Sequence, residues 1–123
     1  MPSIGHVIVG LTARPGVPAR GAQVLAVLAL GVFASLAADL DVVVLPWDPP
    51  SRAMWGHRGA SHSLVAAGLI AAVVALIGRR WALPPRRMAA IGFVMAVSHL
   101  ALDCLNVGSV GVPWLWPLSS TCY

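Results

Sequence analysis

Residues 21–38 form a run of 18 residues without one charged side chain, and this run limits the folds open to the chain. A helix of that length rises about 27 Å, close to the roughly 30 Å hydrocarbon core of a bilayer. Further apolar segments lie at residues 64–78 and 88–102, and a shorter one at residues 4–13. We predict an all-α multipass membrane bundle, with a short N-terminal helix and three spanning helices near residues 20–38, 62–78 and 88–104.

The composition supports a membrane protein. The chain is 59% hydrophobic and 10% charged, with a mean hydropathy of +0.84, whereas soluble domains carry about 25% charged residues. The alternative is a compact soluble bundle, because each span is near the minimum length. A length of 123 residues indicates a single domain over residues 1–123. Basic residues interleaved with aromatic ones are missing from the sequence, so no nucleic-acid partner is expected.

Charged residues separate along the apolar segments. One set of predicted helix ends carries six of the eight arginines: Arg14, Arg20, Arg79, Arg80, Arg86 and Arg87. The other set carries the four aspartates and three of the four histidines: Asp39, Asp41, Asp48, Asp103, His57, His62 and His99. Helical rise places His62 about 25 Å from Arg79, and Arg87 about 24 Å from Asp103. Arginine-rich short loops stay in the cytoplasm. We therefore expect an inner-membrane protein whose histidines and aspartates face the periplasm or the exterior, and this one-sided clustering argues against ion transport through the membrane.

The first candidate site is the pair His99 and Asp103. Residues four apart share a helix face, so the imidazole and the carboxylate can point at one ion. A buried hydrogen-bonded pair is the alternative. Ionisable groups inside a membrane helix cost about 2.5 kcal/mol or more, which favours a function.

A second candidate, Asp39-Leu40-Asp41, ends the first long apolar run. Two carboxylates two residues apart share a side if the chain is extended there, and the prolines and glycines of residues 39–61 predict a loop. Such a pair suits a divalent cation. Ordinary helix termination with solvated aspartates is the alternative.

The third candidate is the segment His57-Arg58-Gly59-Ala60-Ser61-His62. We expect Gly59 to make a turn and Ser61 to cap a helix that begins at His62. A helix N-terminus beside a guanidinium suits a phosphate group, so Arg58 and Ser61 are candidate catalytic residues. The two imidazoles would then be metal ligands. Alternatively, both histidines lie at the membrane interface and Arg58 meets lipid headgroups. Near the N-terminus, the spacing of His6 and Gly10 allows close helix packing.

The order of these motifs resembles the membrane-bound metal-dependent hydrolases, also described as LexA-binding, inner-membrane-associated hydrolases. The resemblance covers residues 6–117, including Trp116-Pro117, and its HRGxxHS and SHxxxD elements are the distinctive ones. The HxxxD helix is also similar, more distantly, to zinc-dependent phospholipase C. The resemblance implies a multipass helical protein whose metal ligands are His6, Asp39, Asp41, His57, His62, His99 and Asp103. Family members usually continue into further helices, so we expect this chain to be C-terminally short of them and to act as a homo-oligomer or with a partner chain.

Two functions follow from these features. The first is metal-dependent hydrolysis at the outer membrane face, with zinc as the first choice of ion and manganese or iron as alternatives. Arg58 and the helix terminus would hold the anionic group of a phosphoester or lipid-linked substrate, and the lipid bilayer would be the main partner. The second is a non-catalytic membrane adaptor or scaffold, in which the same residues hold a structural metal in a closed site.

Overall fold

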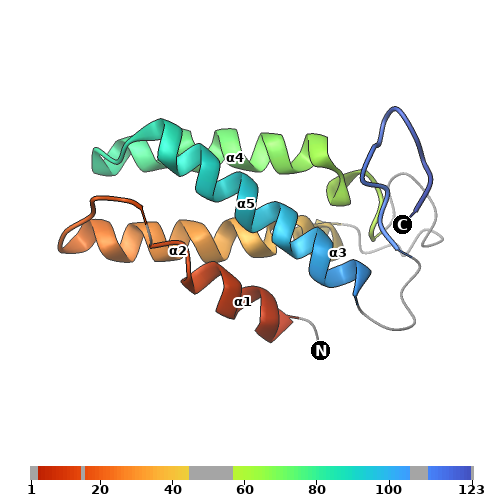
Figure 1. Ribbon diagram of the computed structural model, residues 1–123, viewed down its shortest axis with the longest axis horizontal. Coiled ribbons are helices and arrows are strands. Elements are labelled where there is room, and N and C mark those ends of the chain that lie inside the picture. The colour runs from red at the N-terminus through yellow and green to blue at the C-terminus, as the bar shows by residue number, and fades with distance from the viewer. Residues whose placement is uncertain (1–2, 15, 45–56, 106–110, 123) are drawn as a thin grey trace.

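The computed structural model describes residues 3–14, 16–44, 57–105 and 111–122, and the regular structure within these ranges is entirely helical (Figure 1). The prediction of an all-α fold is confirmed. The longer helices are α1 (Ser3–Leu11), α2 (Ala22–Leu36), α4 (Leu64–Gly78) and α5 (Pro85–Cys104). The short elements are α3 (Asp41–Val44) and the 3₁₀ turns η1 (Ala37–Leu40), η2 (Ala60–His62) and η3 (Arg79–Trp81).

Within the described residues, three helical segments are long and apolar enough to cross a membrane, as predicted. They are Ala22–Leu40, Leu64–Trp81 and Pro85–Cys104, with 19, 18 and 20 residues. The first of them includes the 3₁₀ turn η1 after α2, and the second includes η3 after α4. The nine residues of α1 rise only about 14 Å, so this helix reaches part of the way across.

The helices pack through small and medium-sized apolar residues. Val27 of α2, Val74 of α4 and Met88 of α5 are fully buried at the centre of the core. Large apolar side chains such as Leu25 and Leu69 remain exposed on the outside of the bundle. A soluble protein rarely leaves so much apolar surface uncovered, whereas a bilayer accommodates it without cost.

Two glycines bring α1 into direct contact with α2. A Cβ atom on Gly10 would lie 2.5 Å from the Cα of Val32, and one on Gly31 would lie 2.5 Å from the carbonyl oxygen of Gly10. The predicted close packing at Gly10 is therefore confirmed. The contact fixes α1 beside the last turns of α2, where Ser35 Oγ donates a hydrogen bond of 2.7 Å to the carbonyl of His6.

The two ends of the bundle differ in chemistry. Residues 16–21 and the turn between α4 and α5 lie at one end (Figure 1). Arg20, Arg79 and Arg80 belong to these segments, and Arg87, in the adjoining first turn of α5, donates from Nη1 to the carbonyl of Gly16 at 2.8 Å. At the opposite end, the backbone N–H of Leu64 donates to the carbonyl of Trp114 at 3.0 Å, and the Trp114 indole N–H donates to Cys104 Sγ at 3.2 Å. The C-terminal segment is thus fastened to α4 and α5 beside the histidines and aspartates.

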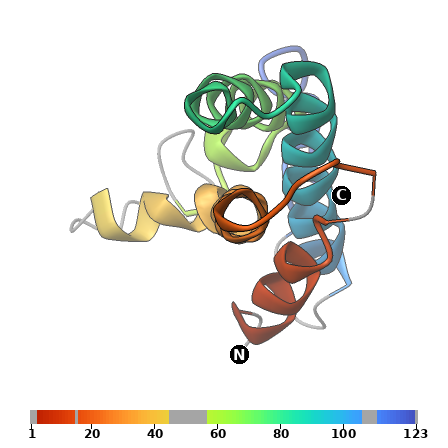
Figure 2. The same ribbon diagram turned by 90° about the vertical axis from the view of Figure 1, so that its left-hand side faces the viewer.

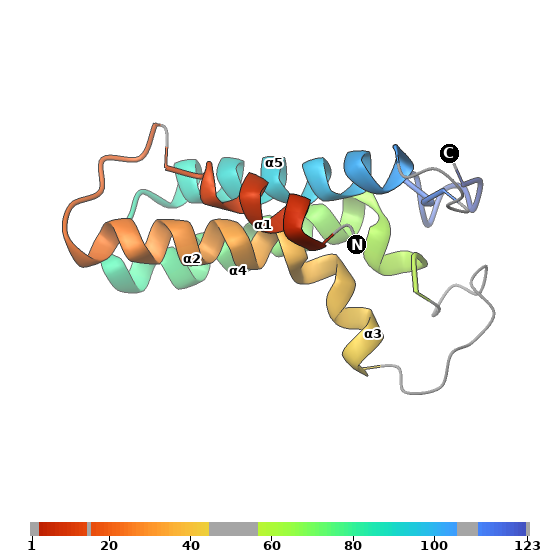
Figure 3. The ribbon, with the colours of Figure 1, turned by 90° about the horizontal axis from the view of Figure 1, so that it is seen from below.

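Residues 39–44, the first part of the predicted loop, are helical instead. After α2 the chain continues as η1 and then α3, which turns away from the bundle (Figures 2 and 3). Residues 45–56, which include Trp47 and Asp48, lie outside the described residues. Because the backbone is helical at Asp39 and Asp41, residues two apart point in different directions, so the expectation that the two carboxylates share a side is wrong.

Candidate metal centre

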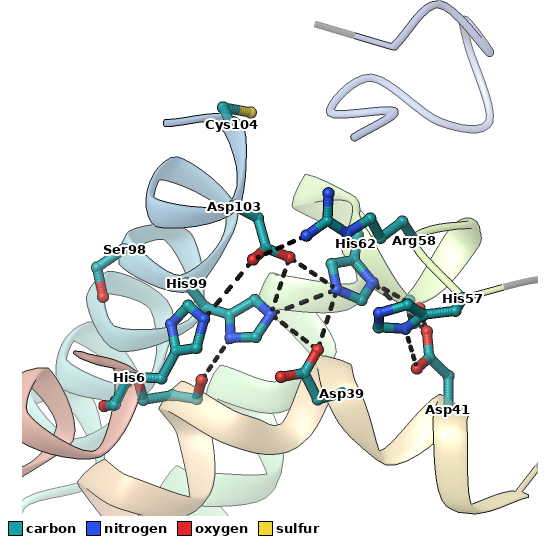
Figure 4. Close-up of polar contacts among 12 residues, drawn as sticks. His6, Asp39, Asp41, His57, Arg58, His62, Ser98, His99, Asp103 and Cys104 are labelled. Carbon is teal, nitrogen blue, oxygen red and sulfur yellow. Dashed lines mark hydrogen bonds and ion pairs between the residues drawn. The ribbon is translucent and has the colours of Figure 1, made fainter. Parts of the chain in front are cut away.

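Three elements direct polar side chains to one point at the end of the bundle (Figure 4). Asp39 comes from η1, His62 from η2, and His99 and Asp103 from α5. One ligand atom from each lies within 4.8 Å of all the others. We call these four residues the inner group. His62, His99 and Asp103 are buried, and the side chain of Asp39 is 30% exposed, so Asp39 is the member open to the outside.

The spacing of the inner group fits a divalent ion. His62 Nε2 and His99 Nε2 are 3.3 Å apart. Asp39 Oδ1 lies 3.5 and 3.4 Å from these two nitrogens, and Asp103 Oδ2 lies 3.4 and 3.6 Å from them. The centre of a regular tetrahedron with such edges is about 2.0–2.2 Å from each corner, which is the range of zinc–nitrogen and zinc–oxygen bonds.

A backbone carbonyl fixes the orientation of His99. Its Nδ1 lies 2.7 Å from the carbonyl oxygen of Ser35 and must donate, because a carbonyl only accepts. Neutral His99 therefore presents a lone pair on Nε2 to the inner group, the arrangement typical of a metal-ligating histidine. Sequence reasoning missed Ser35. The sequence carries no signal for this contact, because every residue supplies a backbone carbonyl, and the Ser35 hydroxyl bonds the carbonyl of His6 instead.

The carboxylates give the inner group the charge that holds a cation. Burial alone would lower the pKa of His62, but its hydrogen bonds with Asp103, Asp39 and Asp41 raise this pKa to about 10. A proton on His62 and a metal ion between the donors are alternative ways to supply the positive charge. Metal binding would release that proton, as expected for histidine ligands.

A second set of contacts lies on the other side of the His62 ring and contains Asp41, His57 and Ser61, which we call the outer group. Asp41 Oδ1 is 2.9 Å from His57 Nδ1, and Ser61 Oγ donates to Asp41 Oδ2 at 2.6 Å. Ser61 Oγ also lies 2.9 Å from His62 Nδ1. Burial would raise the pKa of Asp41, but hydrogen bonds from His62, Ser61 and His57 hold it well below its usual range.

The backbone turns before η2, as predicted, and the residue in the left-handed conformation is Arg58, with φ 68°. Such a φ is uncommon for a residue with a side chain, and it turns Arg58 back over α5. Arg58 Nη2 lies 3.4 Å from Asp103 Oδ1, and a second guanidinium nitrogen points away from that carboxylate (Figure 4).

The prediction that Ser61 caps the helix is wrong. Helix α4 begins at Leu64, and its N-cap is Ser63, whose Oγ accepts a hydrogen bond of 3.2 Å from the N–H of Ala66. Ser63 Oγ in turn donates to the carbonyl of Ala60 at 2.8 Å. Ser61 is thus free of a capping role, and its hydroxyl belongs to the outer group.

His6 lies beside the inner group. It is fully buried, and its ring stacks on that of His99 with a centroid distance of 4.0 Å and an angle of 29°. Its Nε2 is 3.6 Å from Asp103 Oδ1. The structure therefore gathers all seven residues named as metal ligands: four in the inner group, Asp41 and His57 in the outer group, and His6 against His99.

Comparisons with known proteins give one family and one curated relative. Residues 1–123 match the YdjM inner membrane protein family. A 90-residue stretch is 36% identical to "Inner membrane protein YbcI" of Escherichia coli (strain K12), covering 72% of this chain and 52% of that protein. The chain thus spans about half the length of this relative. Both descriptions name a membrane location and no activity. No solved structure matches the chain.

Proposed function

The chain belongs to the YdjM inner membrane protein family, and we propose that it is a metal-dependent hydrolase whose metal centre is the inner group. The observation that carries this proposal is the convergence of two imidazole nitrogens and two carboxylate oxygens with five separations of 3.3–3.6 Å. Distances of that size are longer than the usual 2.7–3.2 Å of an N–H···O hydrogen bond, so these contacts are weak hydrogen bonds, and they suit donors that share one ion. Zinc is the first choice for two nitrogens and two oxygens, and manganese or iron are alternatives.

The residues around the ion have separate roles in this proposal. A divalent ion would act as a Lewis acid and would lower the pKa of water to about 7. His62, His99, Asp39 and Asp103 would hold it. Arg58 would bind the anionic group of the substrate, since one guanidinium nitrogen pairs with Asp103 and another points away from it.

The surroundings favour a phosphoester or lipid-linked substrate. Asp39 is the exposed member of the inner group, and its neighbours Leu40 and Val42 expose apolar side chains. A molecule with an anionic head and an apolar tail would match both features. The arginines at the opposite end of the bundle support a periplasmic position for the site, by the positive-inside rule.

The experiment is elemental analysis combined with an activity assay on the full chain purified in detergent. We expect about one divalent ion per chain, cleavage of a chromogenic phosphodiester, and loss of both after treatment with a chelator. Restoration by zinc, manganese or iron added separately would identify the active ion. Protein that folds but never binds a divalent ion would contradict the proposal.

A second candidate is the membrane adaptor or scaffold with a structural ion. It is favoured by the number of protein donors: four fill a tetrahedral zinc shell, whereas catalytic zinc sites keep one position for water. Both candidates use the same four residues, so catalytic activity distinguishes them. If the ion is structural, the wild-type protein will carry stoichiometric metal, lack hydrolytic activity on every phosphoester tested, and lose thermal stability when the ion is removed.

A further inference from the structure

We propose that Ser61 and Asp41 are positioning residues that set the tautomer of His62, so that its Nε2 is free to bind the ion. This inference rests on the proposed metal centre. It assigns the outer group a supporting role, although Asp41, His57 and His62 are also close enough together to form a ligand set of their own.

The hydrogen bonds of Ser61 decide the position of the ring proton. A hydroxyl has one proton to donate, and that of Ser61 goes to the Asp41 carboxylate at 2.6 Å. Towards His62 Nδ1, at 2.9 Å, the Ser61 oxygen can then only accept. Neutral His62 therefore carries its proton on Nδ1 and a lone pair on Nε2.

Asp41 is held from two sides, which makes it a firm anchor for Ser61. His57 Nδ1 contacts Oδ1 at 2.9 Å, and Ser61 contacts Oδ2. These lengths are those of ordinary hydrogen bonds, shorter than any separation in the inner group. An ion bound by the outer group would have to break these hydrogen bonds. The geometry therefore favours a supporting role for Asp41 over a role as a metal ligand.

The two histidines of the inner group are thus oriented by different acceptors. His99 donates from Nδ1 to the carbonyl of Ser35, which every sequence would supply at that point of the backbone. His62 depends on a side chain, Ser61. Without it, the ring proton could move to Nε2 and occupy the space that the ion requires, and supporting contacts of this kind are worth about 10–100-fold in metal affinity.

The test measures zinc affinity of the full chain in detergent, with zinc alone as the probe. We expect Ser61→Ala and Asp41→Ala each to weaken zinc binding by about 10–100-fold. The double variant should have about the same zinc affinity as the single variant with the lower affinity, because the two residues act as a unit. Ser61→Thr keeps the hydroxyl and should restore affinity close to that of wild type. Ser63→Ala is the matched control, since it removes a helix cap and should lower thermal stability without changing zinc affinity.

A spectroscopic measurement separates positioning from a general loss of stability. In ¹¹³Cd-loaded, ¹⁵N-labelled protein, we expect cadmium to couple to Nε2 of His62, and Nδ1 to carry a slowly exchanging proton. In Ser61→Ala that proton should exchange fast. Coupling through Nδ1 of His62, or unchanged zinc affinity in Ser61→Ala, would overturn the positioning role and leave the metal centre standing. Wild-type protein that binds neither zinc nor cadmium would overturn both.

Discussion

The inner and outer groups share the ring of His62, yet the distances within them differ, and this difference underlies the proposed division into metal ligands and supporting residues. Five distances between ligand atoms of the inner group are 3.3–3.6 Å. In the outer group, the contacts of Asp41 with His57 and Ser61 and of Ser61 with His62 are 2.6–2.9 Å long, whereas Asp41 Oδ2 lies 3.5 Å from His62 Nδ1. Both groups contain histidine and aspartate, so residue type does not distinguish them. The distances do, because a hydrogen atom and a metal ion need different amounts of room.

The largest effect is expected from removing an inner donor. His99→Ala should lower zinc affinity by more than the roughly 100-fold upper limit of a supporting contact, because the proposed ion loses one of its four donors. Elemental analysis and zinc titration measure this, with thermal stability recorded beside them. If His99→Ala keeps its zinc and loses only stability, the pair His99 and Asp103 is a buried hydrogen-bonding unit instead of a ligand pair.

Arg58→Ala should separate substrate binding from metal binding. Its guanidinium touches the metal centre through Asp103 Oδ1, at 3.4 Å, and is not a donor to the ion. Loss of a charged hydrogen bond to the substrate costs about 1.5–3 kcal/mol, so KM for an anionic substrate should rise by about 10–100-fold. Metal content should stay stoichiometric. Loss of metal in this variant would mean that Arg58 mainly holds Asp103 in place.

The contact between α1 and α2 provides a test of how far the inner group depends on its neighbour His6. In Gly31→Ala, the new Cβ would lie 2.5 Å from the carbonyl oxygen of Gly10, so we expect a loss of about 1–3 kcal/mol in the free energy of unfolding. Gly68→Ala is the matched control, because a Cβ there meets nothing within 4 Å. It should stabilise α4 slightly, by up to about 1 kcal/mol.

Zinc titration of the same two variants shows whether α1 holds the metal centre. The inner donors come from η1, η2 and α5, so zinc affinity should fall little in Gly31→Ala while stability falls clearly. An affinity loss as large as that of His99→Ala would instead make α1 an essential wall of the site.

The smallest effect is expected at the exposed edge of the outer group. His57 is 40% exposed and contacts Asp41, which keeps its bond to Ser61 when His57 is removed. His57→Ala should therefore reduce zinc affinity by less than about tenfold, the lower limit for a supporting contact. A loss comparable to that of His99→Ala would show that His57 is itself a ligand, and the division into inner and outer groups would be wrong.

The sequence by itself determined the membrane helices and the end of the bundle at which the site forms. In a bilayer, a run of 18 uncharged residues must satisfy its backbone hydrogen bonds internally, and an α-helix does this within one segment. Helical rise then places residues such as Arg79 and His62 at opposite ends, so the gathering of histidines and aspartates at one end follows from length and spacing.

Only the tertiary structure decided which residues share a point in space and what each one does there. The turn η1 places Asp39 in the inner group, and the start of α3 places Asp41 in the outer group, although the two are only two residues apart in the sequence. Ser63 caps α4, and Ser61 contacts His62 instead. The sequence alone does not show which of these two nearby serines is the cap. The reason is physical: a ligand set requires separations correct to a few tenths of an ångström across three segments, and local sequence preferences fix only the backbone within each segment.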